Sequence, residues 1–261
     1  MKRTLKLILV CLCIISICSI NAFASTQSYS WYCIRNKEHR QPSADSNMTF
    51  IEDFNGYYVD KKHTDNCEEK VIYLTFDAGY ENGNIAKILN VLAEENVPAA
   101  FFVLKNILVK NPELIKRMND EGHIVCNHTS SHPDITKLCS IDELRCEVEE
   151  LESIYKNIVG KDMPKYFRPP EGKFSKQSME FLSSLGYKTI FWSFAYADWD
   201  NNAQMSAEAA KKKILDNIHN GEIMLLHPTS ATNATILKDI IIELRSQGYR
   251  FGTLDELTQG S

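Results

Sequence analysis

From residue 70 onward, apolar and polar residues follow two alternating patterns. Short apolar runs typical of buried strands occur as "VIYLTF" at 71–76, "VPAAFFVL" at 97–104 and "EIMLLH" at 222–227. Between them lie stretches whose apolar residues recur three and four positions apart. The clearest, at 84–96, has apolar residues at 85, 88, 89 and 92 and predicts an amphipathic helix.

The same alternation continues through the rest of the chain. Strands are also predicted at 123–128, 165–170 and 187–194, and helices at 111–122, 141–160, 175–186, 206–221 and 233–248. Apolar strands that alternate with helices predict a parallel sheet covered by helices. The number of strand–helix units favours a closed or nearly closed barrel over an open sheet. The expected fold is therefore α/β, a distorted (β/α) barrel.

The residues before this region divide into two parts. Residues 1–24 start with a basic stretch, continue as an apolar run and end in "AFA", which is the layout of a secretory signal peptide. An uncut membrane anchor is the alternative, although the apolar run is short for a span. Residues 25–68 are polar and irregular with scattered aromatics, and predict an N-terminal arm packed on the main domain at 69–261. The protein is expected to act outside the cytoplasm.

Charge and cysteine content narrow the possible partners and cross-links. The formal net charge is −5, residues 1–24 contribute only positive charges, and no basic cluster follows, which argues against a nucleic-acid partner. An odd number of cysteines follows the leader, so they cannot all pair within the chain and no disulfide is assigned. They are Cys33, Cys67, Cys126, Cys139 and Cys146.

Five polar residues lie at or just beyond the carboxyl ends of five different predicted strands. In parallel α/β barrels this rim carries the chemistry, because its loops vary without disturbing the core. Side chains from separate strands can therefore converge on one pocket. The five residues are Asp77, His128, Arg168, Asp198 and His227.

Three local patterns suggest roles for these residues. In "NHTSSHPD", His128 and His132 are four apart, which is a divalent-metal spacing if the loop turns helically; two surface histidines are the alternative. Arg168 precedes two prolines that stiffen its turn, so it either orients a carboxylate or is a surface cation. A carboxylate such as Asp198 would hold His227 protonated as an acid, whereas a lone histidine after an apolar run is often a core residue.

In order along the chain, "TFDAG", "HTSSH", "RPPEG", "ADW" and "LLH" resemble the five motifs of NodB-like polysaccharide deacetylases, carbohydrate esterase family 4. The resemblance covers about residues 70–257. The longer strings "TFDAGYENG", "FWSFAYADWD" and "LLHPTSATNATIL" are similar to the spore-cortex branch, the muramic acid de-N-acetylases that lead to δ-lactam. The family fold is a distorted (β/α) barrel, which agrees with the strand–helix alternation.

The resemblance implies roles for the first motifs. Asp77 matches the general base, and His128 and His132 match two ligands of a divalent metal ion, with zinc expected. Asp77 is a further candidate ligand. Arg168 matches the cation that steadies the base.

The later motifs imply the remaining roles. His227 matches the general acid that protonates the leaving amine, and Asp198 matches the carboxylate that tunes it. Trp199 and Leu225 match the apolar wall around the acetyl methyl group. The backbone N–H of Glu171 would help to stabilise the oxyanion together with the metal.

The chain departs from the family pattern at Ala78. Most of the family has a second Asp there as the third metal ligand. The metal is therefore expected to be held weakly, either by fewer protein ligands or with Asp77 serving as a ligand as well. Glu81 and Asn82 are close enough in sequence to be substitutes.

The implied activity is de-N-acetylation of a cell-wall amino sugar. The expected substrate is N-acetylmuramic acid in peptidoglycan whose stem peptides have been removed. One alternative is a deacetylase of chitin-like, N-acetylglucosamine or xylan substrates. An alternative of another class is a barrel that binds the wall without turnover, although a mere binder needs neither Asp77 nor His227.

Overall fold

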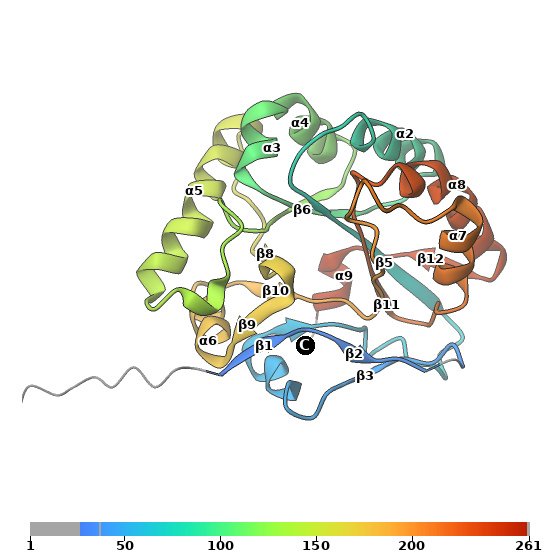
Figure 1. Cartoon of the computed structure of the whole chain (residues 1–261), viewed down its shortest axis with the longest axis horizontal. Helices are drawn as coiled ribbons and strands as arrows, with labels where there is room; N and C mark the ends of the chain where they lie inside the picture. Colours follow the sequence, from blue (N-terminus) through green and yellow to red (C-terminus); the bar gives the residue numbers. More distant parts are fainter. Residues whose placement is uncertain (1–26, 37, 260–261) are drawn as a thin grey trace, which may run out of the picture.

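Parallel strands form the centre of the molecule (Figure 1). The computed structural model describes residues 27–36 and 38–259, so the signal peptide expected at 1–24 lies outside the described residues. One sheet runs in the order β11-β5-β6-β7-β8-β10-β4, with β12 beside β5, and every ladder within it is parallel. Its strands are β4 (Gly56–Tyr57), β5 (Lys70–Ala78), β6 (Ala100–Val103), β7 (Ile124–Asn127), β8 (Tyr166–Phe167), β10 (Lys188–Ile190), β11 (Glu222–Leu226) and β12 (Tyr249–Phe251).

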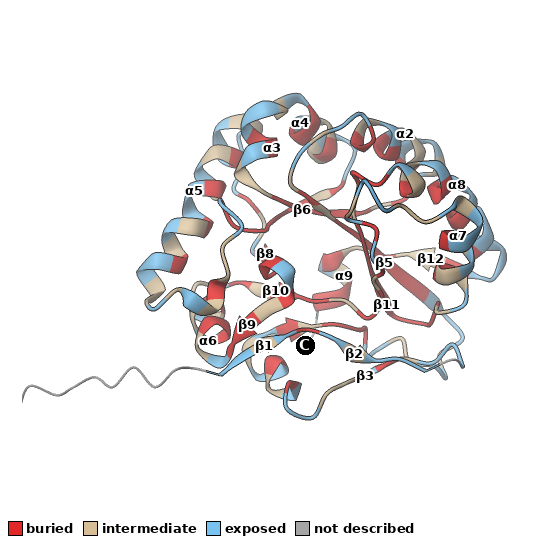
Figure 2. Cartoon of the chain, viewed as in Figure 1, coloured by how far each residue is buried: buried red, intermediate tan, exposed pale blue. Residues whose placement is uncertain are grey.

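Helices cover the outside of this sheet. Figure 2 shows them buried on the side that faces the strands and exposed on the other, which is the two-sided pattern expected of amphipathic helices. The expected distorted (β/α) barrel is therefore confirmed. No helix of the described residues is long and apolar enough to cross a membrane. The helices are α2 (Ile85–Glu95), α3 (Lys105–Lys110), α4 (Pro112–Asp120), α5 (Ile141–Val159), α6 (Lys176–Ser184), α7 (Ala207–Leu215), α8 (Ala231–Ser246) and α9 (Leu254–Thr258).

Several elements are shorter than their apolar patterns predict: β6 and β8 cover only part of the strands predicted at 97–104 and 165–170, and α7 and β10 also end early. Helix α7 ends at Leu215, six residues before the predicted end. Strand β10 ends at Ile190, because the chain beyond it changes partners: the Phe191 N–H donates to the Tyr57 carbonyl and the Ser193 N–H to the Ile223 carbonyl. The extended segment after β10 thus joins β4 to β11 and narrows the gap between the sheet edges.

The segment before β5 packs on the barrel and gives it a strand. β4 belongs to the main sheet, and Val59 forms an antiparallel bridge with Glu222 at the start of β11. The other short elements here and in the rim loops are β1 (Ser28–Ser30), β2 (Cys33–Ile34), β3 (Ser43–Ala44), β9 (Lys173–Ser175) and the 3₁₀ turns η1 (Thr49–Phe54), η2 (Ile135–Lys137) and η3 (Pro170–Gly172). β1 pairs with β9 and β2 with β3, both antiparallel.

Trp31 anchors this segment. Its side chain is 5% exposed and its ring lies 4.6 Å from that of Phe191 and 5.1 Å from that of Tyr58, centroid to centroid. The indole N–H donates to the Trp192 carbonyl at 2.8 Å, so the polar atom of the buried ring is satisfied. The next residue, Tyr32, is 52% exposed.

The five cysteines of the described chain are free thiols. Cys33 and Cys67, which flank the arm in sequence, make separate contacts: Cys33 donates to the Ser193 carbonyl and Cys67 to the Lys62 carbonyl. Cys126 is fully buried in β7, where it packs as a small apolar side chain.

We expect Trp31→Ala to lower the free energy of unfolding by about 3–5 kcal/mol, because it empties a large buried site and leaves the Trp192 carbonyl without its donor. Tyr32→Ala, the neighbouring exposed aromatic, is the matched control and should cost about 0.5 kcal/mol or less. Urea unfolding of both variants measures the difference. Equal losses would contradict the anchoring role of Trp31.

Candidate active site

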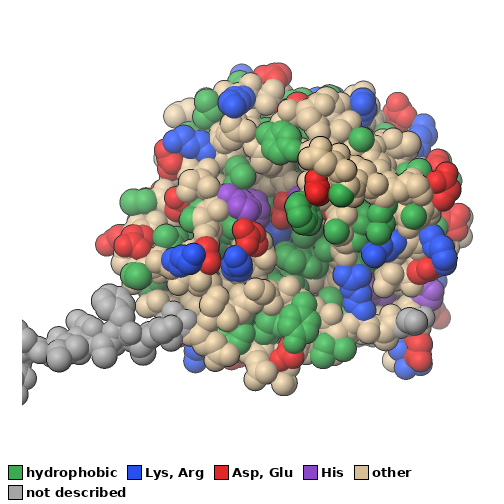
Figure 3. Space-filling view, viewed as in Figure 1, with side chains coloured by type: hydrophobic (Ala, Val, Ile, Leu, Met, Phe, Trp, Pro, Cys, Tyr) green, Lys and Arg blue, Asp and Glu red, His purple; other side chains and the backbone are tan. Residues whose placement is uncertain are grey.

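A cleft of about 720 Å³ opens at the carboxyl ends of strands β5, β7 and β11. Figure 3 shows this face of the molecule hollowed near its centre, with hydrophobic side chains on the floor of the hollow and a histidine at its edge. The predicted residues that line the cleft are Asp77, His128, His132, Glu171, Trp199, Leu225 and His227. Arg168 and Asp198 lie behind this lining: Arg168 contacts Asp77 and His128, and Asp198 contacts His227.

Arg168 holds Asp77 from below the cleft. Its Nη1 donates to Asp77 Oδ1 at 2.8 Å, and its Nη2 donates to the hydroxyl of Thr75, two residues earlier on the same strand, at 2.9 Å. Nε and Nη2 also donate to the carbonyls of Ile190 and Phe191. The guanidinium carbon lies 4.1 Å from the ring centroid of Phe102, which adds a cation–π contact, and the Arg168 side chain is fully buried.

Both members of this pair are shifted in pKa. Complete burial lowers the pKa of Arg168, and Asp77 partly offsets that loss. Burial alone would raise the pKa of Asp77, but the charges of Arg168, His128 and His227 outweigh it and lower the pKa below its usual range. Asp77 is therefore an ionised carboxylate at neutral pH.

The loop after β7 brings the two histidines together without a helical turn. Thr129 and His132 have positive φ values of 73° and 61°, so the helical loop that their spacing suggested is wrong. The loop is instead closed by the Asn127 side chain, which accepts from the Thr129 N–H, and by the Thr129 hydroxyl, which accepts from the His132 N–H. The two imidazole rings lie edge to face, 5.1 Å apart.

His128 is neutral and presents a lone pair to the cleft. Its Nδ1–H donates to the Arg168 carbonyl at 2.7 Å, and burial lowers its pKa to about 4. The other ring nitrogen, Nε2, lies 3.6 Å from Asp77 Oδ2. Two electron pairs that face each other at this distance repel unless a cation lies between them, so the donor set suits a divalent ion. Within the described residues, no group of three or more His, Cys, Asp or Glu side chains is already arranged to hold one.

Residues 78, 81 and 82 supply no ligand to this set. Ala78 is fully buried in the apolar cluster between the sheet and the helices, and it does not line the cleft, whereas its neighbours Asp77 and Gly79 do. Glu81 accepts from the N–H groups of Gly83 and Ile85 at the start of α2. Asn82 donates to the Thr229 carbonyl. The expected substitution by Glu81 or Asn82 is therefore wrong for this structure.

His227 on the far side of the cleft is held by Asp198. Its Nδ1–H donates to Asp198 Oδ1 at 2.7 Å, and its backbone N–H donates to Oδ2 at 2.8 Å. Asn233 in α8, which the sequence patterns did not single out, donates to the same Oδ2 at 2.6 Å and receives a hydrogen bond from Tyr196. Burial alone would lower the pKa of His227, but the hydrogen bond and charge of Asp198 outweigh it and raise the pKa.

The walls of the cleft are aromatic and apolar. Trp199 is 62% exposed at the mouth, whereas Leu225 is 4% exposed in the floor. Tyr80 and Trp192, which sequence reasoning missed, also line it. Glu171 has a left-handed backbone (φ 55°), an uncommon conformation for a residue with a side chain, and its carboxylate pairs with Lys173 at 2.6 Å.

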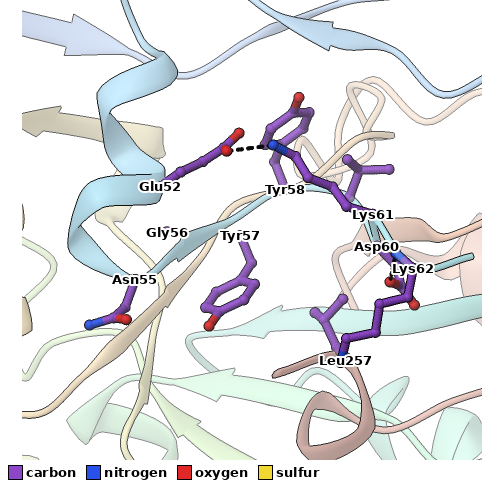
Figure 4. A pocket seen from close by; sticks show the side chains of 10 residues that line it. Glu52, Asn55, Gly56, Tyr57, Tyr58, Asp60, Lys61, Lys62 and Leu257 are labelled. Carbon is purple, nitrogen blue, oxygen red and sulfur yellow. Dashed lines mark hydrogen bonds and ion pairs between the residues drawn. The ribbon is translucent and has the colours of Figure 1, made fainter. Parts of the chain in front are cut away.

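A second cavity, of about 400 Å³, lies apart from these residues, between the segment around β4 and helix α9. Figure 4 shows Lys61 reaching across it to Glu52, with the side chains of Tyr57 and Leu257 on its opposite wall. None of the predicted site residues lines it. It offers no arrangement of acid and base comparable to that of the cleft.

Comparison with known proteins shows what this chain is similar to. The family model described as polysaccharide deacetylase matches residues 64–190. The peptidoglycan-N-acetylmuramic acid deacetylase PdaA of Bacillus subtilis is 41% identical over 87% of this chain and 85% of its own. Its solved structure, described as a family 4 carbohydrate esterase, covers 88% of this chain and 97% of that one with a TM-score of 0.83 and 39% identity. A peptidoglycan-N-acetylglucosamine deacetylase of Bacillus cereus is 33% identical over 73% of this chain and 69% of its own.

We expect Asp198→Asn to lower the pKa of His227 by roughly one pH unit or more, because the charge that outweighs burial is removed. The imidazole would then lose its proton at lower pH than in the wild type. An NMR titration of the ring of His227 measures this directly. Asp200→Asn, the next acidic residue along the chain, is the matched control. An unchanged titration in Asp198→Asn would show that the pair does not set the protonation state.

Proposed function

This chain belongs to the polysaccharide deacetylase family, and we propose that it removes the N-acetyl group from N-acetylmuramic acid in peptidoglycan stripped of stem peptides. One observation carries the proposal: a cleft lined on one side by a carboxylate and two histidines, and on the other by a histidine that is hydrogen-bonded to Asp198. The identity of 41% with a muramic acid deacetylase supports the choice of sugar.

The two sides of the cleft suit the two proton transfers of amide hydrolysis. Asp77, held by Arg168, accepts a proton from the water that attacks the acetyl carbonyl carbon. His227 donates its proton to the amide nitrogen as the C–N bond breaks, so the products are acetate and the free amine. Asp198 raises the pKa of His227, which favours the protonated imidazole that this step requires.

A divalent ion, zinc in our proposal, would be held by His128, His132 and Asp77. When bound, it supplies Lewis acidity to the acetyl carbonyl. Ala78 packs its methyl group into the core and supplies no ligand to the metal site. We therefore expect this ion to be held weakly.

The rest of the lining positions the acetyl group. Trp199 and Leu225 would enclose its methyl group, and the backbone N–H of Glu171 would donate to the oxygen that gains negative charge. The left-handed backbone of Glu171 sets the direction of this N–H and supports that assignment.

The product offers a route to a lactam. Deacetylation frees an amine at C2 beside the lactyl carboxylate at C3, and two groups on one ring have a high effective molarity for closure. We propose that the protein serves δ-lactam formation in the spore cortex, outside the cytoplasm, with residues 1–24 as its signal peptide. The domain boundaries at 25–68 and 69–261 belong to the same proposal.

The rival activity is deacetylation of N-acetylglucosamine, chitin-like or xylan substrates, supported by the similarity to a peptidoglycan-N-acetylglucosamine deacetylase. The rival of another class is a barrel that binds glycan without turnover. Buried hydrogen bonds orient Asp77 and His227. These bonds favour catalysis over binding alone, because they prepare the two side chains for proton transfer and are not needed for contact with a sugar.

We expect the purified protein to deacetylate peptide-stripped glycan and to act poorly on glycan that bears stem peptides. Mass spectrometry should show loss of acetyl, with loss of water reporting lactam closure. Asp77→Asn and His227→Ala should each lower turnover at least ~10²-fold, since general acid–base steps are typically worth that much. Circular dichroism checks that both variants fold. Equal rates on the two glycans would contradict the choice of sugar, and near-normal turnover in either variant would contradict its role.

Calorimetric titration of metal-free protein with zinc should show one site, and dialysis against a chelator should empty it readily. His132→Ala should abolish this binding, because it removes a nitrogen ligand from a set that has no spare one. His39→Ala, an exposed histidine of the arm, is the control and should bind as the wild type does. Failure of the wild type to bind zinc, or unchanged binding in His132→Ala, would refute the ligand set.

A further inference from the structure

Arg35 in the arm differs from the other arginines in its ion pairing. Over residues 27–36 and 38–259, no carboxylate lies within 4 Å of its guanidinium, and its side chain is exposed. The other arginines of this part of the chain each pair with Asp or Glu: Arg40, Arg117, Arg145, Arg168, Arg245 and Arg250.

Arg35 does not itself line the cleft, but it is held against one residue of the lining. Arg35 Nη2 donates to the carbonyl of Ala195, a lining residue, at 2.6 Å, and the guanidinium carbon lies 5.2 Å from the ring centroid of Phe194. The arm beside it is tied to the same wall, since the Trp31 N–H donates to the Gly172 carbonyl and the Cys33 thiol to the Ser193 carbonyl. The guanidinium has five N–H donors, and Ala195 takes one. The remaining donors are thus held in place before a ligand arrives, which lowers the entropy cost of binding.

Within residues 27–36 and 38–259, no acidic side chain forms an ion pair with Arg35. Complete burial raises the pKa of Glu222 well above its usual range, and the nearby charge of Arg35 offsets part of that rise. The net charge of the chain is −5, which makes an unpaired cation beside the cleft more significant. Arg35 is therefore available to an anionic group on the substrate.

The other cations near the cleft are already engaged. Arg168 is fully buried and its guanidinium donates to Asp77, Thr75 and two carbonyls. Lys173 pairs with Glu171. Unlike these two cations, Arg35 has no carboxylate partner among residues 27–36 and 38–259.

We infer that Arg35 binds the lactyl carboxylate of the muramic acid residue and so selects glycan without stem peptides. The inference rests on the proposed function. The lactyl group is attached at C3, next to the acetamide at C2, so its carboxylate lies at the cleft when the acetyl group is at Asp77. A planar guanidinium can bind a carboxylate with two parallel hydrogen bonds. A stem peptide converts that carboxylate into a neutral amide and removes the charge that Arg35 recognises.

The test compares two substrates: peptide-stripped glycan oligomers, and the same oligomers with their lactyl carboxylates converted to methyl amides. We expect the wild type to prefer the carboxylate form. In Arg35→Gln, the ratio of kcat/KM between the two forms should fall about tenfold or more, mainly through KM, because a charge-assisted pair is lost. Arg35→Lys should recover part of the ratio. Arg40→Gln, an exposed arginine of the same arm paired with Glu38, is the matched control and should keep the wild-type ratio.

The remaining outcomes separate the inference from the proposed function. A wild type that does not distinguish the two forms, or an Arg35→Gln variant that keeps the ratio, overturns the role of Arg35 but leaves muramic acid deacetylation standing. Equal losses on both forms would assign Arg35 to anchoring the arm on Ala195 and would also overturn it. A wild type that deacetylates only N-acetylglucosamine oligomers contradicts the proposed function itself.

Discussion

The site is organised by one buried ion pair, between Arg168 and Asp77. Removing a guanidinium from water costs several kcal/mol unless its donors and its charge are matched inside the protein. Here the cost is offset by Asp77, by the Thr75 hydroxyl and by the carbonyls of Ile190 and Phe191. These acceptors come from β5 and from the end of β10, so the pair also fixes how those strands meet. The carboxylate of Asp77, the base in our proposal, is thereby placed by the same contacts that join these strands.

Two histidines in the cleft show how environment assigns opposite roles to one residue type. His128 gives its Nδ1–H to a backbone carbonyl and is buried, which lowers its pKa to about 4 and leaves a lone pair suited to a metal. His227 gives its Nδ1–H to the carboxylate of Asp198, which raises its pKa and suits it to donate a proton. The difference is the charge of the acceptor, since both rings are largely removed from water.

The arm is more than a cover for the barrel. It supplies β4 to the sheet, and its extended part from Trp31 to Arg35 runs along the segment after β10, where hydrogen bonds tie it to residues 172 and 192–195. These bonds hold Arg35 against Ala195, which lines the cleft. Arg35 precedes residues 64–190, the part of the chain that the family model matches. In our proposal, selectivity for the substituent of the sugar therefore resides in the arm, whereas the acid and base come from the barrel.

The sequence by itself determined the alternation of strands and helices and the position of Asp77, His128, Arg168, Asp198 and His227 near strand ends. Both are local properties: periodicity reports which face of an element is buried, and a polar residue directly after an apolar strand must lie at its carboxyl end. Only the tertiary structure decided which of these residues meet. The bond of Asn233 to Asp198, the packing of Ala78 into the core and the capping of α2 by Glu81 depend on contacts that the local pattern does not encode. The same holds for Arg35: only the packing of the arm brings it into contact with Ala195 and Phe194, and the local sequence pattern does not indicate that contact.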